Sequence, residues 1–174
     1  MREAILLSSF LWLAACASSP PSYPPPPQKK SLDATGPGGL RHFVSFSDPA
    51  ASAYVVRDID PAGDPGGWRW AWRHPQMRFY LATTRSLSFR ADLILPGRIL
   101  REVGPVTVAV RVNGHPAGQA RYDQPGEHRF EEPVPEGFLV AGINTVSIEP
   151  DKVWIAKGDG QALSFLIARA GFVE

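Results

Sequence analysis

The amino-acid sequence predicts one all-β sandwich that begins near Leu40. Three observations lead to this fold class. Apolar residues recur at every second position, which is the period of a strand with one buried face. Glycine, proline, asparagine and aspartate interrupt that pattern about every eight to twelve residues, as the turns of a sandwich or barrel do. No stretch carries the apolar stripe of an amphipathic helix, and only one helical turn is expected, at 97–103.

Each strand is placed where apolar and polar residues alternate. The expected strands, in chain order, are residues 43–47, 54–57, 77–82, 87–95, 105–113, 116–122, 127–131, 144–149 and 163–167. The clearest alternation runs from Val106 to Val112, where four valines form one face of the strand. Asn113-Gly114 follows this strand and is a strong hairpin signal, because both residues tolerate a positive φ.

The charge balance and the cysteine content exclude several kinds of function. The 174 residues carry a net charge of +1 without a basic cluster, which argues against nucleic acid as a partner. Cys16 is the only cysteine, so the sandwich has no disulfide, thiol nucleophile or cysteine-zinc site. A domain of this length can be stable by burial alone.

Residues 1–15 have the composition of a secretory signal peptide. A charged start is followed by an apolar run from Ala4 to Leu13 that is too short to span a bilayer. The sequence Leu13-Ala14-Ala15-Cys16 resembles the lipobox of bacterial lipoproteins. The alternative is an ordinary signal peptide whose last residue happens to be a cysteine.

The lipobox resemblance implies where the protein works. In that family the cysteine thiol is joined to a diacylglycerol, the chain is cut before the cysteine, and the new N-terminus is usually acylated. Two or three acyl chains would hold the protein on a membrane effectively permanently. Because Ala17 rather than aspartate follows Cys16, the resemblance implies the outer membrane of a two-membrane envelope.

Residues 16–39 are expected to form a disordered tether, which leaves 40–174 for the sandwich. Prolines dominate this segment and large apolar residues are almost absent. It therefore buries too little to repay the entropy cost of ordering it. We interpret it as a spacer; the alternative is a ligand for a proline-recognising groove or for the cell wall.

The region Val106–Glu149 carries a second resemblance. The residues that carry it are Asn113-Gly114, Gly118, Phe130, Leu139, Gly142-Ile143-Asn144, Val146 and Ile148. This pattern resembles the galactose-binding-like jelly rolls, and is closest to the sugar-binding sandwiches attached to bacterial glycoside hydrolases. The resemblance implies a jelly-roll β-sandwich. It implies no binding residue, because the glycines and asparagines are turn residues and many members bind no sugar.

Three tryptophans and two arginines form the richest local feature, the sequence Gly67-Trp68-Arg69-Trp70-Ala71-Trp72-Arg73. In an extended chain the tryptophans project from one face and the arginines from the other. A row of aromatic rings can stack on the C–H faces of sugars, while arginines bond the hydroxyls. The alternative is a packed strand face, because indoles are mostly buried. Trp154 has the same two interpretations.

Other chemistry-bearing residues form no recognisable site. Asp58, Asp60 and Asp64 share one loop and would suit Ca²⁺, which jelly rolls of the resembling superfamily often carry. Their spacing is not that of an EF-hand, and we interpret them as turn residues. The four histidines are scattered, and neither a nucleophile elbow nor a phosphate-binding loop is present. We therefore expect no metal, no cofactor and no catalytic residue.

Two functional hypotheses follow. The first is a lipid-anchored, non-catalytic module of the cell envelope that binds carbohydrate or envelope glycan. Its binding residues would be Trp68, Trp70, Trp72, Arg69 and Arg73. The second is a structural or assembly lipoprotein whose sandwich docks on a protein partner, and an enzyme is the least favoured class. The exposure of the three indoles distinguishes the first two hypotheses.

Overall fold

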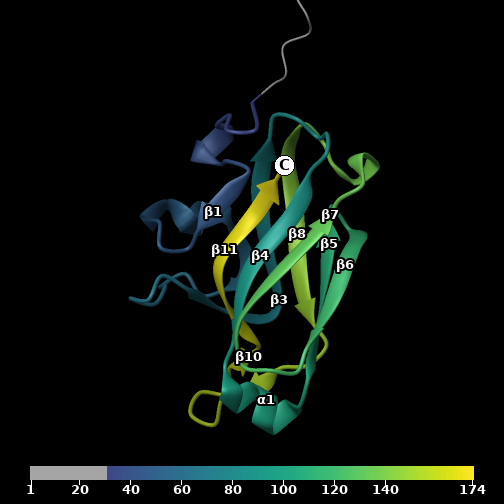
Figure 1. The fold of residues 1–174 in the computed structure, drawn as a ribbon. Helices are drawn as coiled ribbons and strands as arrows, with labels where there is room; N and C mark the ends of the chain where they lie inside the picture. The colour runs from purple at the N-terminus through teal and green to yellow at the C-terminus, as the bar shows by residue number, and fades with distance from the viewer. Residues whose placement is uncertain (1–30) are drawn as a thin grey trace, which may run out of the picture.

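The long strand β3 (Arg69–Leu81) belongs to both layers of the fold in the computed structural model, which describes residues 31–174. Its second half, residues 76–81, pairs with β8 in one layer. Its first three residues pair with β11 in the other layer. One hydrogen-bonded sheet thus folds over into a sandwich, as Figure 1 shows.

The strands of the two layers are antiparallel to their neighbours. The first layer contains, in spatial order, β2 (Val55–Ile59), β3, β8 (Gly142–Pro150), β5 (Val106–Val112) and β6 (His115–Tyr122). The second contains β1 (Phe43–Ser45), β11 (Phe165–Val173), β4 (Ser88–Leu95) and β7 (Gly126–Pro133). The remaining elements are α1 (Gly97–Val103), β9 (Trp154–Ile155), β10 (Ala162–Leu163) and the 3₁₀ turns η1 (Pro37–Gly39), η2 (Pro49–Tyr54) and η3 (Glu136–Phe138).

The core lies between the layers and consists of the alternating residues that the sequence predicted. The four valines of β5 are at most 1 % exposed. Phe79 of β3 reaches across to Phe89 and Phe172 of the other layer, with ring centroids 6.2 and 5.8 Å apart. The predicted all-β sandwich is therefore confirmed, together with the buried faces of its central strands.

Two strands differ substantially from their predicted limits, whereas the others differ by at most two residues at either end. The strand expected at 77–82 is only the second half of β3, because alternation fails where Arg73 and His74 are both exposed. The strand expected at 163–167 is divided between β10 and β11, and β11 continues to Val173. Runs of consecutive buried residues in β11 hide the period of two, because both of its faces are partly covered.

The hairpin predicted at Asn113-Gly114 is present, with φ angles of 50° and 84°. The Asn113 amide also donates to the Phe138 carbonyl and to Asn144 Oδ1, both at 2.8 Å. Asn144 is fully buried and forms two further bonds to the backbone of Val140, at 2.9 and 2.7 Å. The asparagines of the jelly-roll pattern thus join loops together, which is a structural role.

Residues 31–39, assigned above to the tether, contact the sandwich. Leu32 packs against the core, and the Asp33 carboxylate lies 3.1 Å from His42 Nε2. Gly36 lies so close to the Tyr80 ring that a Cβ atom would collide with it. Cys16, the signal peptide and the rest of the tether lie outside the described residues. Within 31–174, no helix has the length and apolarity needed to cross a membrane.

Candidate functional site

The three tryptophans of the row lie on the outer face of the sandwich, and each is half-buried. Arg69 and Ala71 alternate with them and are buried, at 5 % and 0 % exposed. Trp70 lies opposite Leu166 in the pairing of β3 with β11. Leu166 is itself buried but does not belong to the main core cluster. The row is therefore neither a fully exposed surface nor a part of the core.

The rings at the two ends of the row line different cavities. Trp72 lines a small cavity of about 300 Å³ with Arg73, Gln161 and Ala162. Its indole N–H is buried and has no partner among the described residues. Trp68 lines a groove on the face of the second layer, where charged side chains also gather. Trp68 is thus the member of the row that is placed to meet a polar ligand.

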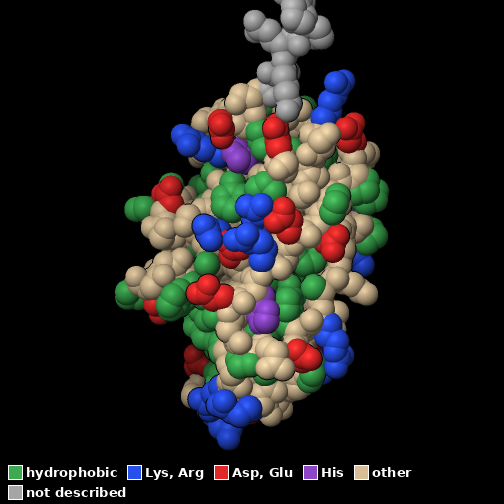
Figure 2. Space-filling model, viewed as in Figure 1, with side chains coloured by type: hydrophobic (Ala, Val, Ile, Leu, Met, Phe, Trp, Pro, Cys, Tyr) green, Lys and Arg blue, Asp and Glu red, His purple; other side chains and the backbone are tan. Residues whose placement is uncertain are grey.

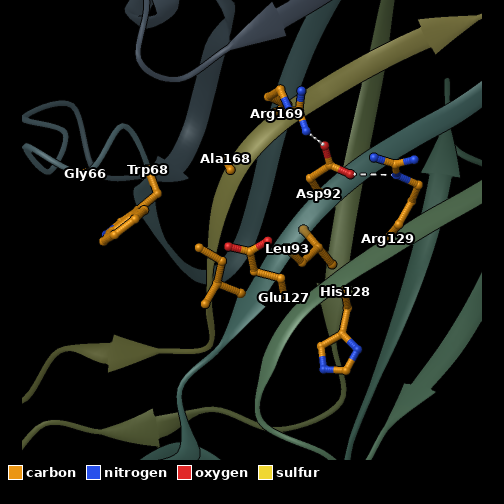
Figure 3. Close-up of a pocket in the computed structure, with 10 residues that line it drawn as sticks. Gly66, Trp68, Asp92, Leu93, Glu127, His128, Arg129, Ala168 and Arg169 are labelled. Atoms are coloured by element: carbon orange, nitrogen blue, oxygen red, sulfur yellow. Dashed lines mark hydrogen bonds and ion pairs between the residues drawn. The ribbon is translucent and has the colours of Figure 1, made fainter.

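The groove that Trp68 lines crosses β11, β4 and β7 and has a volume of about 420 Å³. Trp68 stands on one side, on the loop before β3, and Ala168 of β11 lies between it and the charged side chains (Figure 3). Ile94 and Glu127 line the groove from β4 and β7. Figure 2 shows basic and acidic side chains gathered on this face of the molecule.

Asp92 sits at the centre of the charged side of the groove, with only 16 % of its side chain exposed. Its carboxylate accepts a hydrogen bond from Arg129 Nε at 2.9 Å and pairs with Arg169 Nη2 at 2.8 Å. The two arginine side chains are just over half exposed. Because two guanidinium groups share one carboxylate, the cluster has a formal charge of +1. Its other N–H groups form no further hydrogen bond within residues 31–174.

A β-bulge in β11 builds this cluster. The register between β11 and β4 shifts between Ile167 and Arg169, so Arg169 lies opposite Asp92. The shift allows two consecutive residues, Ala168 and Arg169, to line the same groove. In a regular strand such neighbours would point to opposite faces.

A second ion pair extends the charged surface along β4 and β7. Arg90 donates to both carboxylate oxygens of Glu131, at 2.8 and 3.1 Å. This hydrogen bonding lowers the pKa of Glu131 and raises the pKa of Arg90. Glu127, at the other end of the groove, has no ion pair among the described residues. The groove therefore offers both hydrogen-bond donors and acceptors.

Gly66 fixes the position of the Trp68 ring. A Cβ atom at residue 66 would collide with three carbons of the indole. The ring thus packs directly on the backbone of its own loop, which limits how far it can turn inward. The Trp68 ring is therefore held against Gly66, which has no side chain of its own.

The other predicted binding residues lie away from the groove. Arg69 points inward, donates to Ser52 Oγ at 3.1 Å and has its guanidinium 5.6 Å from the centre of the Phe46 ring. Arg73 is exposed beside Trp72. The structure therefore does not bring the five predicted residues together in one place.

Trp154 is held by the helix α1. Its indole N–H donates to Glu102 at 2.7 Å, and the Arg98 guanidinium lies 4.5 Å from its ring centre. The Trp154 hydrogen bond is the main cause that lowers the pKa of Glu102, followed by the bond from Arg98. These contacts indicate a structural role for Trp154.

The aspartate-rich loop forms turns. Asp60 and Asp64 accept hydrogen bonds from the backbone N–H groups of Ala62 and Gly66, at 2.8 and 2.9 Å. Asp58 accepts one from the His74 N–H at 2.8 Å. Asp60 and Asp64 thus stabilise local backbone bends, as aspartates in turns commonly do, whereas Asp58 joins β2 to β3. Among residues 31–174, no three metal-ligating side chains lie close enough to hold an ion.

Sequence reasoning missed the charged half of the groove. Asp92 and Arg129 are ordinary outward-facing positions of their strands, and nothing local marks them. Arg169 lies beyond the strand predicted at 163–167 and reaches the groove through the bulge in β11. The available signal was that the strands 87–95 and 127–131 each place charged residues on their outward face. Which of these residues meet depends on strand pairing, which the sequence did not reveal.

The comparisons with known proteins give weak matches. No protein-family model matches the chain, and no curated protein does. A family 35 carbohydrate binding module from an environmental isolate is 14 % identical, with a TM-score of 0.44, over 80 % of this chain and 91 % of the module. A family 35 module from Clostridium thermocellum is 16 % identical, with a TM-score of 0.42, over 76 % and 98 %. With TM-scores below 0.5, these similarities carry no conclusion about the ligand.

Proposed function

We propose that the protein is a lipid-anchored, non-catalytic module of the cell envelope that binds glycan in the Trp68 groove. The observation that carries this proposal is the position of the half-buried Trp68 indole in the groove. Across the groove from it, Arg129 and Arg169 both pair with Asp92. An aromatic ring offers a flat apolar surface for the C–H face of a sugar. The charged groups opposite it can bond the hydroxyls.

The chemistry of the groove suits hydroxyl groups. A hydroxyl donates one hydrogen bond and accepts others, so it needs both kinds of partner. Arg129 and Arg169 supply donors that Asp92 does not use, and Glu127 supplies free acceptor oxygens. A few polar groups at the edge of an apolar wall are the usual composition of a small-ligand site.

The glycan hypothesis is tested with the full chain in a detergent that contains no sugar. Retention on insoluble polysaccharides and on peptidoglycan should be lost in Trp68→Ala, because the stacking surface is gone. The melting temperature should fall by no more than a few degrees, since the ring is half-exposed. Trp72→Ala is the matched control, because it removes an indole outside the groove and should retain binding.

Two results would count against the glycan hypothesis. One is equal retention by wild type and Trp68→Ala, which would place any binding elsewhere. The other is a wild type that no glycan retains. The alternative is then a protein-docking role, for which Val140, in the turn before β8, and Ile143, at the start of β8, provide apolar side chains that are 52 % and 40 % exposed.

The anchor is the second part of the proposal. The lipobox-like sequence that ends at Cys16 supports it, and Ala17 supports an outer-membrane location. Cys16→Ala should move the protein out of the membrane fraction and abolish the incorporation of labelled fatty acid. If the wild type incorporates no fatty acid, the anchor is wrong, whatever the groove binds.

A further inference from the structure

A second cavity lies on the other side of the loop that carries Trp68. It has a volume of about 420 Å³ and lies between the loop after β1 and the loop that joins β2 to β3. Alternate residues at the end of the β2–β3 loop line the groove and the second cavity. Gly66 and Trp68 line the groove, whereas Gly67 and Arg69 line the second cavity. Both loops project from the same edge of the sandwich (Figure 1).

Arg69 is the unusual residue of this cavity. It is 95 % buried, yet within residues 31–174 it forms no ion pair, and its Nε–H is buried without a hydrogen-bond partner. Among the described residues, the only hydrogen bond of its side chain is the one from Nη1 to Ser52 Oγ. The Phe46 ring beneath the guanidinium supplies a cation–π contact but accepts no conventional hydrogen bond. A buried charge of this kind is costly unless an acceptor reaches it.

Two carboxylates line the same cavity without pairing with Arg69. Asp48 Oδ1 accepts from the Ala50 N–H at 2.8 Å, and Asp64 Oδ1 accepts from the Gly66 N–H at 2.9 Å. The second oxygen of each carboxylate forms no hydrogen bond among the described residues. The cavity thus combines one cation that needs acceptors with two anions that need donors.

The charges of the three side chains that line the cavity indicate which class of ligand it would bind. Arg69, Asp48 and Asp64 together have a formal charge of −1, which disfavours a free anion. A cation would lie beside a buried guanidinium and is disfavoured as well. A hydroxyl group is both donor and acceptor, so neighbouring hydroxyls of one neutral molecule satisfy all three side chains.

We propose that the cavity is a second binding site, for a neutral polyhydroxylated ligand such as a sugar residue. One ligand oxygen accepts from an Nη–H of the Arg69 guanidinium, which lines the cavity, and adjacent hydroxyls donate to Asp48 and Asp64. This site does not depend on the groove and stands even if the Trp68 site binds nothing. If both sites bind the same polysaccharide, their proximity raises the overall affinity through effective concentration.

The test observes the Arg69 Nε–H directly by ¹H–¹⁵N NMR on the isotope-labelled full chain, in a detergent without sugar. D-Xylose, D-galactose and acetate are titrated separately. We expect at least one of the two sugars to shift the Arg69 Nε–H and the Gly63 and Gly67 amides in a saturable way. Acetate should leave them unchanged. If acetate alone shifts them, or if neither sugar does, the proposal is overturned.

Two variants make the assignment specific. Arg69→Met should abolish the sugar-dependent shifts, whereas Trp68→Ala should preserve them. If Arg69→Met does not fold, the double variant Asp48→Asn and Asp64→Asn decides the question. Asparagine keeps the oxygen that accepts from the backbone but removes the charge, so the turns remain. A loss of sugar affinity of at least tenfold supports the site, and an unchanged affinity overturns it.

Discussion

Neighbouring residues of β11 belong to two different regions of the molecule. Phe165 and Ile167 are fully buried in the core, whereas Ala168 and Arg169 line the groove. The same contrast appears on β4, where Ala91 is buried in the core and Asp92 carries the ion pairs of the groove. The core and the groove thus lie on opposite faces of one layer, and adjacent residues of the same strand contribute to each.

This comparison shows how a small sandwich can carry a charged groove on one layer without weakening its fold. The inward residues supply the apolar burial that stabilises folding. The outward residues contribute little to stability and can hold charges that a core could not accept. Substitutions on the two faces should therefore have separable effects on stability and on binding.

The largest effect is expected for Phe165→Ala, an inward substitution. Removing a fully buried phenylalanine typically costs about 3–5 kcal/mol, a large part of the roughly 5–15 kcal/mol that stabilises a domain. Chemical denaturation should show this loss. Trp70→Ala, on the outward face of the neighbouring strand, is the control and should cost clearly less. Equal losses would mean that the two faces are not separable.

Asn144→Ala tests a polar residue on the inward face. The substitution removes the hydrogen-bond partner of the Val140 N–H, the Val140 carbonyl and the Asn113 amide, in a network that is partly buried. Each unsatisfied buried group costs about 1–3 kcal/mol. Because water can reach part of this network, we expect a loss of about 2 kcal/mol in the free energy of unfolding. Thr145→Ala, one residue along β8, is the matched control. A loss below about 1 kcal/mol would show that this hydrogen-bond network contributes little to the stability of the fold.

The smallest effect is expected for the outward pair of Arg90 and Glu131. The folded-state pKa of Glu131 lies below its usual value of 4.5, chiefly because of the hydrogen bond from Arg90. The pair therefore stabilises the fold fully above that usual value and loses its contribution as the pH falls through the folded-state pKa.

Glu131→Gln should lower the melting temperature slightly at pH 7, where the pair contributes fully, and this difference from the wild type should disappear as the pH falls through the folded-state pKa of Glu131. Glu132→Gln on the same strand is the control. If Glu131→Gln melts like the wild type at pH 7 as well as in acid, the Arg90–Glu131 pair contributes nothing to stability.

The local pattern of the sequence was sufficient for the core. Alternation between apolar and polar residues is set by the geometry of a single strand, so the buried faces of β4 and β5 could be read before any pairing was known. The hairpin at Asn113-Gly114 is equally local, because it depends on two residues that tolerate a positive φ. The lipobox-like sequence at Cys16 stays a prediction, since it lies outside the described residues.

The candidate site was decided by tertiary structure. The sequence grouped Arg69 with the tryptophans because they are neighbours in the chain, yet Arg69 lines a different cavity from Trp68. It offered no reason to group Asp92 with Arg169, because their meeting depends on the pairing of β4 with β11 and on a bulge in β11. Strand register is set by hydrogen bonds between segments far apart in the chain, and a bulge changes which face a residue reaches. Local alternation therefore determines what is buried, whereas non-local pairing determines which outward side chains form a site.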